Sequence, residues 1–248
     1  MKNDMLKAYG KTDVGNVREM NQDDFNCGVL GDEEAVFAVV CDGMGGEKGG
    51  NIASRTACDI VTDSVTAAYG SGFGDNSIKR ILQTAVTAAN VSVFDRSQRD
   101  PSLRGMGTTI VAAIVCDGMA HIVHAGDSRA YHITSDKIEQ VTKDHSVVQL
   151  LVDRGEITAD EARFHPKKHF ITRALGVMSI IDLDYCEFPI NEGEAIMVCT
   201  DGLSNYFSND QLFEMIKSAG YSKCVDKLIN AAKKEGGADN ITVVCITR

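Results

Sequence analysis

Apolar residues recur with two different spacings along the chain, and these spacings separate predicted strands from predicted helices. Short apolar or alternating runs of strand length begin the sequence, return in its middle and close it. We expect strands over LKAYGKT (6–12), DDFNCGVL (23–30), AVFAVVC (35–41), TTIVAAIVC (108–116), MAHIVHAG (119–126), SRAYHIT (128–134), KIEQV (137–141), YCEFPI (185–190), EAIMVCT (194–200) and ITVVCIT (241–247). Short turns join the runs between 108 and 141, which predicts an antiparallel meander.

Spacings of three and four residues predict helices between these groups of strands. One helix face runs from Ile52 to Val65 and another from Ile78 to Val93, and further helices are expected over 146–164, 210–218 and 222–235. Helix pairs grouped between antiparallel strands are typical of an α+β fold. We therefore predict a four-layer sandwich, in which two packed, mainly antiparallel β-sheets are flanked by helix pairs. Because no linker or internal repeat interrupts the pattern, residues 1–248 are expected to form a single domain.

Aspartates stand at the ends of several predicted core strands, each beside a Gly or an Asn. They are Asp42 in VVCDG, Asp127 in HAGDS, Asp201 in VCTDG and Asp239 in DNITV. A single Asp-Gly pair after a strand is usually only a turn signal. Four strand ends can converge on one point, however, and gathered carboxylates repel unless a counter-charge is present. Hard cations with oxygen ligands, namely Mg²⁺ or Mn²⁺, are the natural counter-charge, and two such ions could activate a water molecule.

Arg18 and Asp23 precede the second predicted strand, in the segment TDVGNVREMNQDDF. The guanidinium of Arg18 suits a phosphate dianion better than a lysine would, because its planar N–H groups can bind two oxygens at once. The alternative is an ordinary surface arginine paired with Glu19 or Asp23, and taken alone that alternative is favoured.

The amino-acid composition limits the kinds of binding partner and the cellular compartment that we expect for this protein. The chain has 248 residues and a formal net charge of −10, and it contains no basic stripe, so we expect no nucleic-acid partner. The eight cysteines form no CxxC pair and several lie in apolar runs, which predicts buried thiols in a reducing, cytoplasmic compartment. No signal-peptide core or membrane-length apolar run is present, so no membrane association is expected.

Taken in order, several segments make the whole chain resemble the PPM (type 2C) metal-dependent serine/threonine protein phosphatases, particularly the compact bacterial members. The matching segments are Arg18 with Asn21-Gln22-Asp23, DGMGG at 42–46, GMGTT at 105–109, GDSR at 126–129, ITRALG at 171–176, TDGL at 200–203 and DNIT at 239–242. The resemblance implies hydrolysis of phosphoserine and phosphothreonine in proteins by a metal-bridging hydroxide, without a phosphoenzyme. It also implies phosphoprotein substrates and a cognate bacterial Ser/Thr kinase, and we expect a monomer.

The resemblance also implies individual metal ligands. Asp42 is expected to bridge two catalytic Mg²⁺ or Mn²⁺ ions and Gly43 to lend its backbone carbonyl to one of them, while Asp201 and Asp239 complete the other. Asp23 is expected to act through metal-bound water.

Two further roles follow from the same resemblance. Arg18 is expected to hold the substrate phosphate, and Asp127, together with Asp201, matches a third-metal site found in bacterial relatives. The segment from about 146 to 169 corresponds to a variable flap beside the active site.

Two positions depart from the family pattern. Met44 stands where animal members carry a histidine proposed as the general acid, which leaves the proton donor to the leaving group unassigned, and we expect a metal-bound water to serve instead. Gln22 stands where many relatives have Glu, which removes one negative charge near the metals.

Other classes of function differ in the residues that they require. A cysteine phosphatase needs an Arg six residues after its Cys, and no cysteine here has one. A pseudophosphatase that only binds phosphoproteins, or an enzyme of small phosphoesters, could share the fold. The six histidines are expected to have structural or surface roles, given the oxygen-rich alternatives for a metal.

Overall fold

The structure is a computed structural model that describes residues 6–31, 34–70 and 74–248. The rest of the predicted 1–248 domain lies outside the described residues. The described residues form two sheets, and every strand pairing among these residues is antiparallel. One sheet has the order β1 (Lys7–Asp13), β11 (Ile241–Thr247), β10 (Ala195–Cys199), β7 (Arg129–Ile133), β8 (Ile138–Gln140). The other has the order β2 (Asp23–Leu30), β3 (Ala35–Met44), β5 (Ile110–Cys116), β6 (Met119–Ala125), β9 (Asp184–Pro189), with β4 (Gly107–Thr108) paired to β3.

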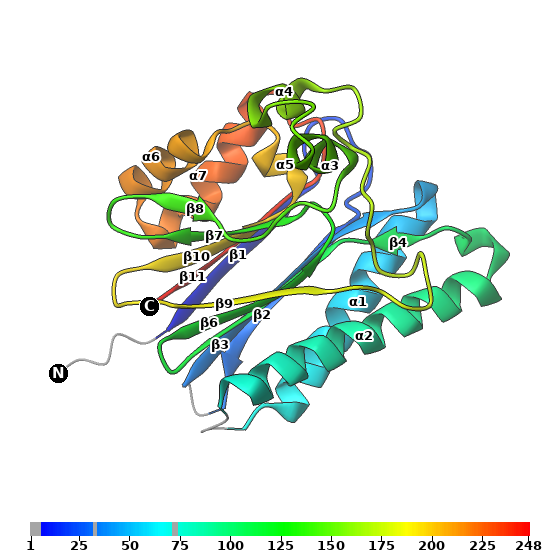
Figure 1. Ribbon diagram of the computed structural model, residues 1–248, viewed down its shortest axis with the longest axis horizontal. Helices are drawn as coiled ribbons and strands as arrows, with labels where there is room; N and C mark the ends of the chain where they lie inside the picture. The colour runs from blue at the N-terminus through cyan, green and yellow to red at the C-terminus, as the bar shows by residue number, and fades with distance from the viewer. Residues whose placement is uncertain (1–5, 32–33, 71–73) are drawn as a thin grey trace.

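Helices cover the outer face of each sheet, which gives the four predicted layers (Figure 1). The sheet of β2 and β3 is covered by α1 (Gly46–Ala68) and α2 (Asp75–Arg99), and the sheet of β10 and β11 by α6 (Asn209–Ala219) and α7 (Tyr221–Lys234). Shorter elements are η1 (Pro101–Leu103), α3 (Val147–Asp153), α4 (Ala159–Phe164) and α5 (Asp201–Ser204). The α+β sandwich predicted from the sequence is therefore confirmed.

Side chains along the central strands alternate between the two faces of each sheet, which explains why the sheets pack on both faces. In β3, Phe37 and Val39 belong to the cluster packed under α1 and α2, while Val36 and Val40 belong to the cluster between the two sheets. Successive strand residues point to opposite faces, so an apolar run such as AVFAVVC is buried on both sides.

The predicted meander over 108–141 is wrong in one connection. Strand β6 pairs with β5 and β9, whereas β7 pairs with β10 and β8 in the other sheet. The chain crosses between the sheets at Gly126, whose φ is 115°, a backbone region that favours glycine. This crossing places Asp127 at the junction of the two sheets.

The predicted helical segment that starts at Ser146 contains two short helices. Ser146 caps α3 by accepting a hydrogen bond from the Gln149 N–H at 3.2 Å, and Thr158 caps α4 in a capping box with Glu161. The base of this segment is closed by a bridge between Ser146 and Ile171. Figure 1 shows α3 and α4 above one end of the sheets.

Candidate active site

A cavity of about 990 Å³ opens where several strands of the two sheets end. Four of the aspartates predicted from the sequence line it, namely Asp42, Asp127, Asp201 and Asp239. They lie on β3, after β6, at the start of α5 and before β11. Segments far apart in the sequence thus bring four carboxylates into one cavity.

A second hollow, of about 960 Å³, runs along α2, and its lining residues include two aspartates and two arginines.

Asp23 lies behind the cavity and directly opposite Asp42 in the β2–β3 pairing. Asp23 is only 7% exposed, and its Oδ2 accepts hydrogen bonds from Thr200 Oγ1 at 2.9 Å and Thr242 Oγ1 at 2.7 Å. Its Oδ1 is buried and has no hydrogen-bond partner among the described residues. Like charges opposite one another destabilise a sheet, and a buried carboxylate oxygen without a partner is costly. Both features call for a cation at this position.

Burial and mutual repulsion raise the pKa of three of these carboxyl groups. Burial raises the pKa of Asp23 to about 7. The pKa of Asp42 lies well above its usual range because of burial and the nearby carboxylates of Asp23 and Asp201. Burial and Asp201 raise the pKa of Asp127 in the same way. A divalent cation would remove this penalty by stabilising the ionised forms.

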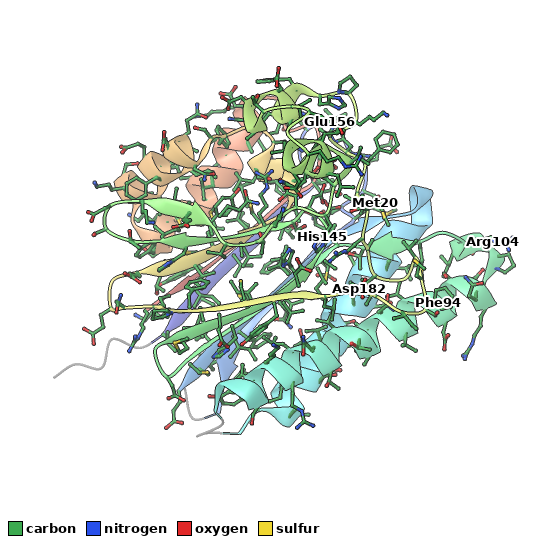
Figure 2. All side chains as sticks on the ribbon, viewed as in Figure 1. Met20, Phe94, Arg104, His145, Glu156 and Asp182 are labelled. Atoms are coloured by element: carbon green, nitrogen blue, oxygen red, sulfur yellow. The ribbon has the colours of Figure 1, made fainter. Side chains whose placement is uncertain are left out.

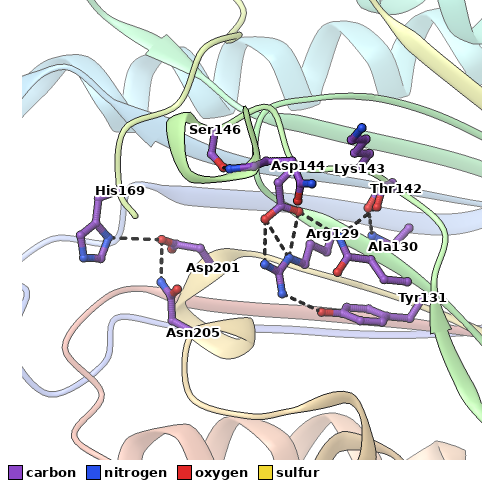
Figure 3. Close-up of polar contacts among 12 residues, drawn as sticks. Arg129, Ala130, Tyr131, Thr142, Lys143, Asp144, Ser146, His169, Asp201 and Asn205 are labelled. Carbon is purple, nitrogen blue, oxygen red and sulfur yellow. Dashed lines mark hydrogen bonds and ion pairs between the residues drawn. The ribbon is translucent and has the colours of Figure 1, made fainter. Parts of the chain in front are cut away.

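Asp201 and Asp239 are held by local hydrogen bonds. Asp201 Oδ2 accepts from Asn205 Nδ2 at 2.9 Å, one helical turn later (Figure 3). Asp239 Oδ1 accepts from the Asn240 N–H at 2.9 Å, and its Oδ2 accepts from Arg18 Nη2 at 2.9 Å. These bonds fix both carboxylates at the edge of the cavity.

The glycines that follow two of the aspartates permit close backbone approach. A Cβ on Gly43 would lie 2.1 Å from the carbonyl oxygen of Gly50 in α1 and 2.5 Å from that of Gln22. A Cβ on Gly202 would lie 1.9 Å from the carbonyl oxygen of Asn240. Asp42 and Gly43 lie inside β3, which continues to Met44 because it pairs with β4, so this Asp-Gly pair is not a turn.

Arg18 lines the same cavity from the loop between β1 and β2. Its ion pair is with Asp239, rather than with Glu19 or Asp23 as the surface-arginine alternative expected. The hydrogen bond and charge of Asp239 raise the pKa of Arg18 above its ordinary value. The Arg18 side chain remains 54% exposed and lines the cavity, so a ligand there can reach it.

Sequence reasoning missed His169 as part of the cavity lining. Its Nδ1 lies 3.9 Å from Asp201 Oδ2 (Figure 3), and its contact with Asp201 raises its pKa. Pro166 and the neighbouring lysines indicated an ordinary loop, and no local pattern marks a residue brought to the site from the far end of the 146–169 segment. Figure 2 shows Glu156 on the outer part of this segment, with Met20 and His145 below it.

The carboxylate set fits hard cations such as Mg²⁺ or Mn²⁺. Among the described residues lining the cavity, acidic side chains outnumber the basic ones, Arg18 and His169. Oxygen-rich sites of this kind suit Mg²⁺ and Mn²⁺, and the unpartnered Oδ1 of Asp23 is an additional oxygen available to the site.

A separate group of His124, His145 and Asp184 has potential ligand atoms within 4.8 Å of one another. We interpret it as an ion-pair network rather than a metal site. The two imidazole rings are stacked at 4.8 Å with an angle of 7°, so their in-plane lone pairs do not converge on one point. Arg173 already donates to Asp184 at 2.7 Å, and His145 Nδ1 accepts from the Gly126 N–H at 3.1 Å. This network supports the turn that carries Asp127.

Comparison with known proteins shows similarity over nearly the whole chain. A family model described as protein phosphatase 2C matches residues 16–242. The serine/threonine phosphatase stp of Listeria innocua is 35% identical over 248 residues, which cover 98% of this chain and 96% of that protein. The serine/threonine protein phosphatase PstP of Mycobacterium tuberculosis is 33% identical over 240 residues, which cover 97% of this chain and 44% of that protein.

Solved structures agree with these similarities. The M. tuberculosis serine/threonine phosphatase PstP/Ppp superposes with a TM-score of 0.87 at 32% identity, covering 98% of both chains. The catalytic domain of PstP in complex with two manganese ions superposes with a TM-score of 0.84 at 29% identity, covering 98% of this chain and 99% of that one.

The described residues contain no helix long and apolar enough to span a membrane.

Proposed function

The chain belongs to the protein phosphatase 2C family, and from this premise we propose that its aspartate-lined cavity hydrolyses phosphoserine and phosphothreonine in proteins. It is a metal-dependent protein serine/threonine phosphatase. The observation that carries the assignment of the site is the convergence of Asp42, Asp127, Asp201 and Asp239 in one cavity, with Asp23 opposite Asp42 behind it.

This convergence supports the proposal that these residues hold cations, and the individual roles proposed for them are those that the family resemblance implies. Asp42 would serve two cations, which the Gly43 carbonyl, Asp201 and Asp239 would also help to hold, and Asp127 would contribute to a third site. When bound, the cations supply Lewis-acid chemistry, which neutralises charge on phosphoryl oxygens and lowers the pKa of water. The catalytic domain of PstP has been solved in complex with two manganese ions, which supports the binding of two cations here.

Asp23 is a support for these ligands because of how it is held. Thr200 and Thr242 come from the sheet of β10 and β11, and both donate to Asp23 Oδ2 on the other sheet. Thr200 Oγ1 also accepts from the Thr242 N–H at 3.0 Å. Two hydroxyl groups thus fix the Asp23 carboxylate across the sheet junction, and its buried Oδ1 has no hydrogen-bond partner among the described residues.

Arg18 is assigned to the substrate phosphate. Its guanidinium carries five N–H donors in a planar fork, of which one contacts Asp239. That contact aims the guanidinium at the carboxylate cluster, and a phosphate placed there can accept the other donors. Met44 also lines the cavity, but its thioether has no proton to give to a leaving group.

The setting of the enzyme is also proposed. We infer a cytoplasmic phosphatase that acts as a monomer and opposes a Ser/Thr kinase. No disulfide joins cysteines in the part of the chain that the structure describes, which suits a reducing compartment. Residues 146–169 would act as a flap, because the base of this segment is closed by the bridge of Ser146 to Ile171 and its far end brings His169 to the cavity.

The test is phosphate release from p-nitrophenyl phosphate and from a phosphothreonine peptide, each with Mn²⁺ and with a chelator. Manganese-dependent turnover of the peptide supports the proposal, whereas a protein that binds the phosphopeptide without turnover is a pseudophosphatase. Preference for small phosphoesters over every phosphopeptide tried would reassign the substrate. Comparing the phosphoproteome of cells with and without the protein then identifies the substrates, as sites whose phosphorylation rises when the protein is absent.

A further inference from the structure

The loop from Val14 to Gln22 carries Arg18 but buries little of its own surface. Residues 16–20 are all exposed, and the apolar residues Val17 and Met20 are 67% and 44% exposed. Apolar burial therefore contributes little to fixing this loop. Its conformation depends on hydrogen bonds to the segment that carries Asp239.

Asn16 fastens the loop to the end of α7. Its Nδ2 donates to the carbonyl oxygens of Lys233 at 2.7 Å and Gly236 at 3.1 Å, and its backbone N–H donates to Gly237 at 2.7 Å. The last carbonyl groups of a helix lack partners within the helix. One asparagine thus ties the Arg18 loop to the helix end that leads into Asp239.

Asn240 fastens the loop at both of its ends. Asn240 is only 5% exposed. Its Nδ2 donates to the carbonyl oxygens of Val14 at 3.0 Å and Met20 at 3.1 Å, and its Oδ1 accepts from the Gln22 N–H at 2.8 Å. Both donor hydrogens and the acceptor of this amide are in use. Arg18 lies between the two donated bonds, and Asn240 is the residue next to Asp239.

We propose that Asn16 and Asn240 are positioning residues that hold Arg18 beside Asp239 before substrate binds. This inference rests on the proposed role of Arg18 in phosphate binding. Because the loop is already fixed, binding the phosphate does not require the backbone around Arg18 to become ordered. Less conformational entropy is then lost on binding, which lowers KM. Asn16 is not among the residues that line the cavity, and Asn240 lines it with its amide groups already bonded to the loop, so we assign both a role through Arg18.

Asn16 gives the cleaner experiment because it is exposed, so its replacement leaves the core intact. Asn16→Ala removes both side-chain bonds, and Asn16→Asp keeps the shape but cannot donate. With saturating Mn²⁺ and a phosphothreonine peptide, both variants should raise KM about five- to tenfold and change kcat less than twofold. Asn191→Ala is the matched control, because Asn191 is an exposed asparagine whose Nδ2 donates to Glu194 at 3.1 Å in the turn before β10; its KM should stay at the wild-type value.

A double-mutant cycle with Arg18→Ala separates positioning from general loosening. If Asn16 acts through Arg18, the double variant has the KM of Arg18→Ala alone. KM effects that multiply, or an Asn16→Ala variant with wild-type KM while Arg18→Ala raises it, would overturn the inference and leave the proposed function intact. An Arg18→Ala variant with wild-type KM would overturn both the inference and the role of Arg18. Asn240→Asp provides a second readout: if it folds, as judged by circular dichroism, it should raise KM in the same direction, and an unchanged KM would count against the proposal.

Discussion

Asp23 and Asp42 lie directly opposite one another in the β2–β3 pairing, one buried behind the cavity and the other lining it. Two carboxylates in such register repel when both are ionised. Burial raises the pKa of both groups; Asp201 and Asp239 raise that of Asp23 further, and Asp23 and Asp201 raise that of Asp42. The stability of the metal-free protein is therefore linked to pH.

The first prediction concerns metal removal. Because the pKa of Asp23 is raised to about 7 by folding, the folded metal-free protein holds more protons than the unfolded chain between roughly pH 4 and 7. Its free energy of unfolding therefore falls as pH rises through that window. If the linkage amounts to about 1 kcal/mol, Tm in chelator falls by about 2–4 °C from about pH 5 to about pH 8.

Calorimetry with and without Mn²⁺ checks this linkage. Manganese displaces protons from the carboxyl groups, so it should raise Tm more at the higher pH. Asp23→Asn should flatten the dependence in chelator. A wild-type Tm in chelator that rises steadily over the same range would refute the linkage.

The second prediction concerns Gly43. Replacing it with Ala puts a Cβ 2.1 Å from the Gly50 carbonyl oxygen, so α1 and β3 must separate. We expect a loss of about 1–3 kcal/mol in the free energy of unfolding and a lower Mn²⁺ affinity. Gly74→Ala is the control, because a Cβ there meets no atom within 4 Å. Equal denaturant midpoints for the two variants would show that the close approach at Gly43 is unimportant.

The third prediction separates Asp127 from the other carboxylates. Asp127→Ala should lower turnover by roughly ten- to a hundredfold and leave two manganese ions bound, because its proposed role is at a third site. Isothermal titration calorimetry counts the ions. Asp182→Ala, an exposed aspartate outside the residues that line the cavity, should behave as wild type. Loss of all metal binding in Asp127→Ala would show that no separate third site exists.

Local patterns predicted most strands and helices because each depends on residues close in sequence. DDFNCGVL and ITVVCIT match β2 and β11 residue for residue, and Asp42, Asp127, Asp201 and Asp239 were predicted to converge and do. The change of sheet between β6 and β7 was not predicted, because a short connection looks alike whether the next strand pairs with the last one or leaves it.

Contacts between residues far apart in the chain could not be predicted from the sequence either. The partner of Arg18 is Asp239, which lies 221 residues away, and nothing near Arg18 indicates it. His169 reaches Asp201 only because the base of the 146–169 segment is closed by the bridge of Ser146 to Ile171. Such contacts follow from the packing of the whole fold rather than from any window of sequence.

The central claim is that the converging aspartates hold the cations that hydrolysis requires. The most direct measurement is manganese-dependent turnover of a phosphothreonine peptide by Asp42→Ala and Asp239→Ala, with circular dichroism to verify the fold. Each variant should keep its fold and lose at least about 10³-fold in kcat, the scale expected for removing a principal electrostatic group. Near-normal turnover in either variant would contradict the claim.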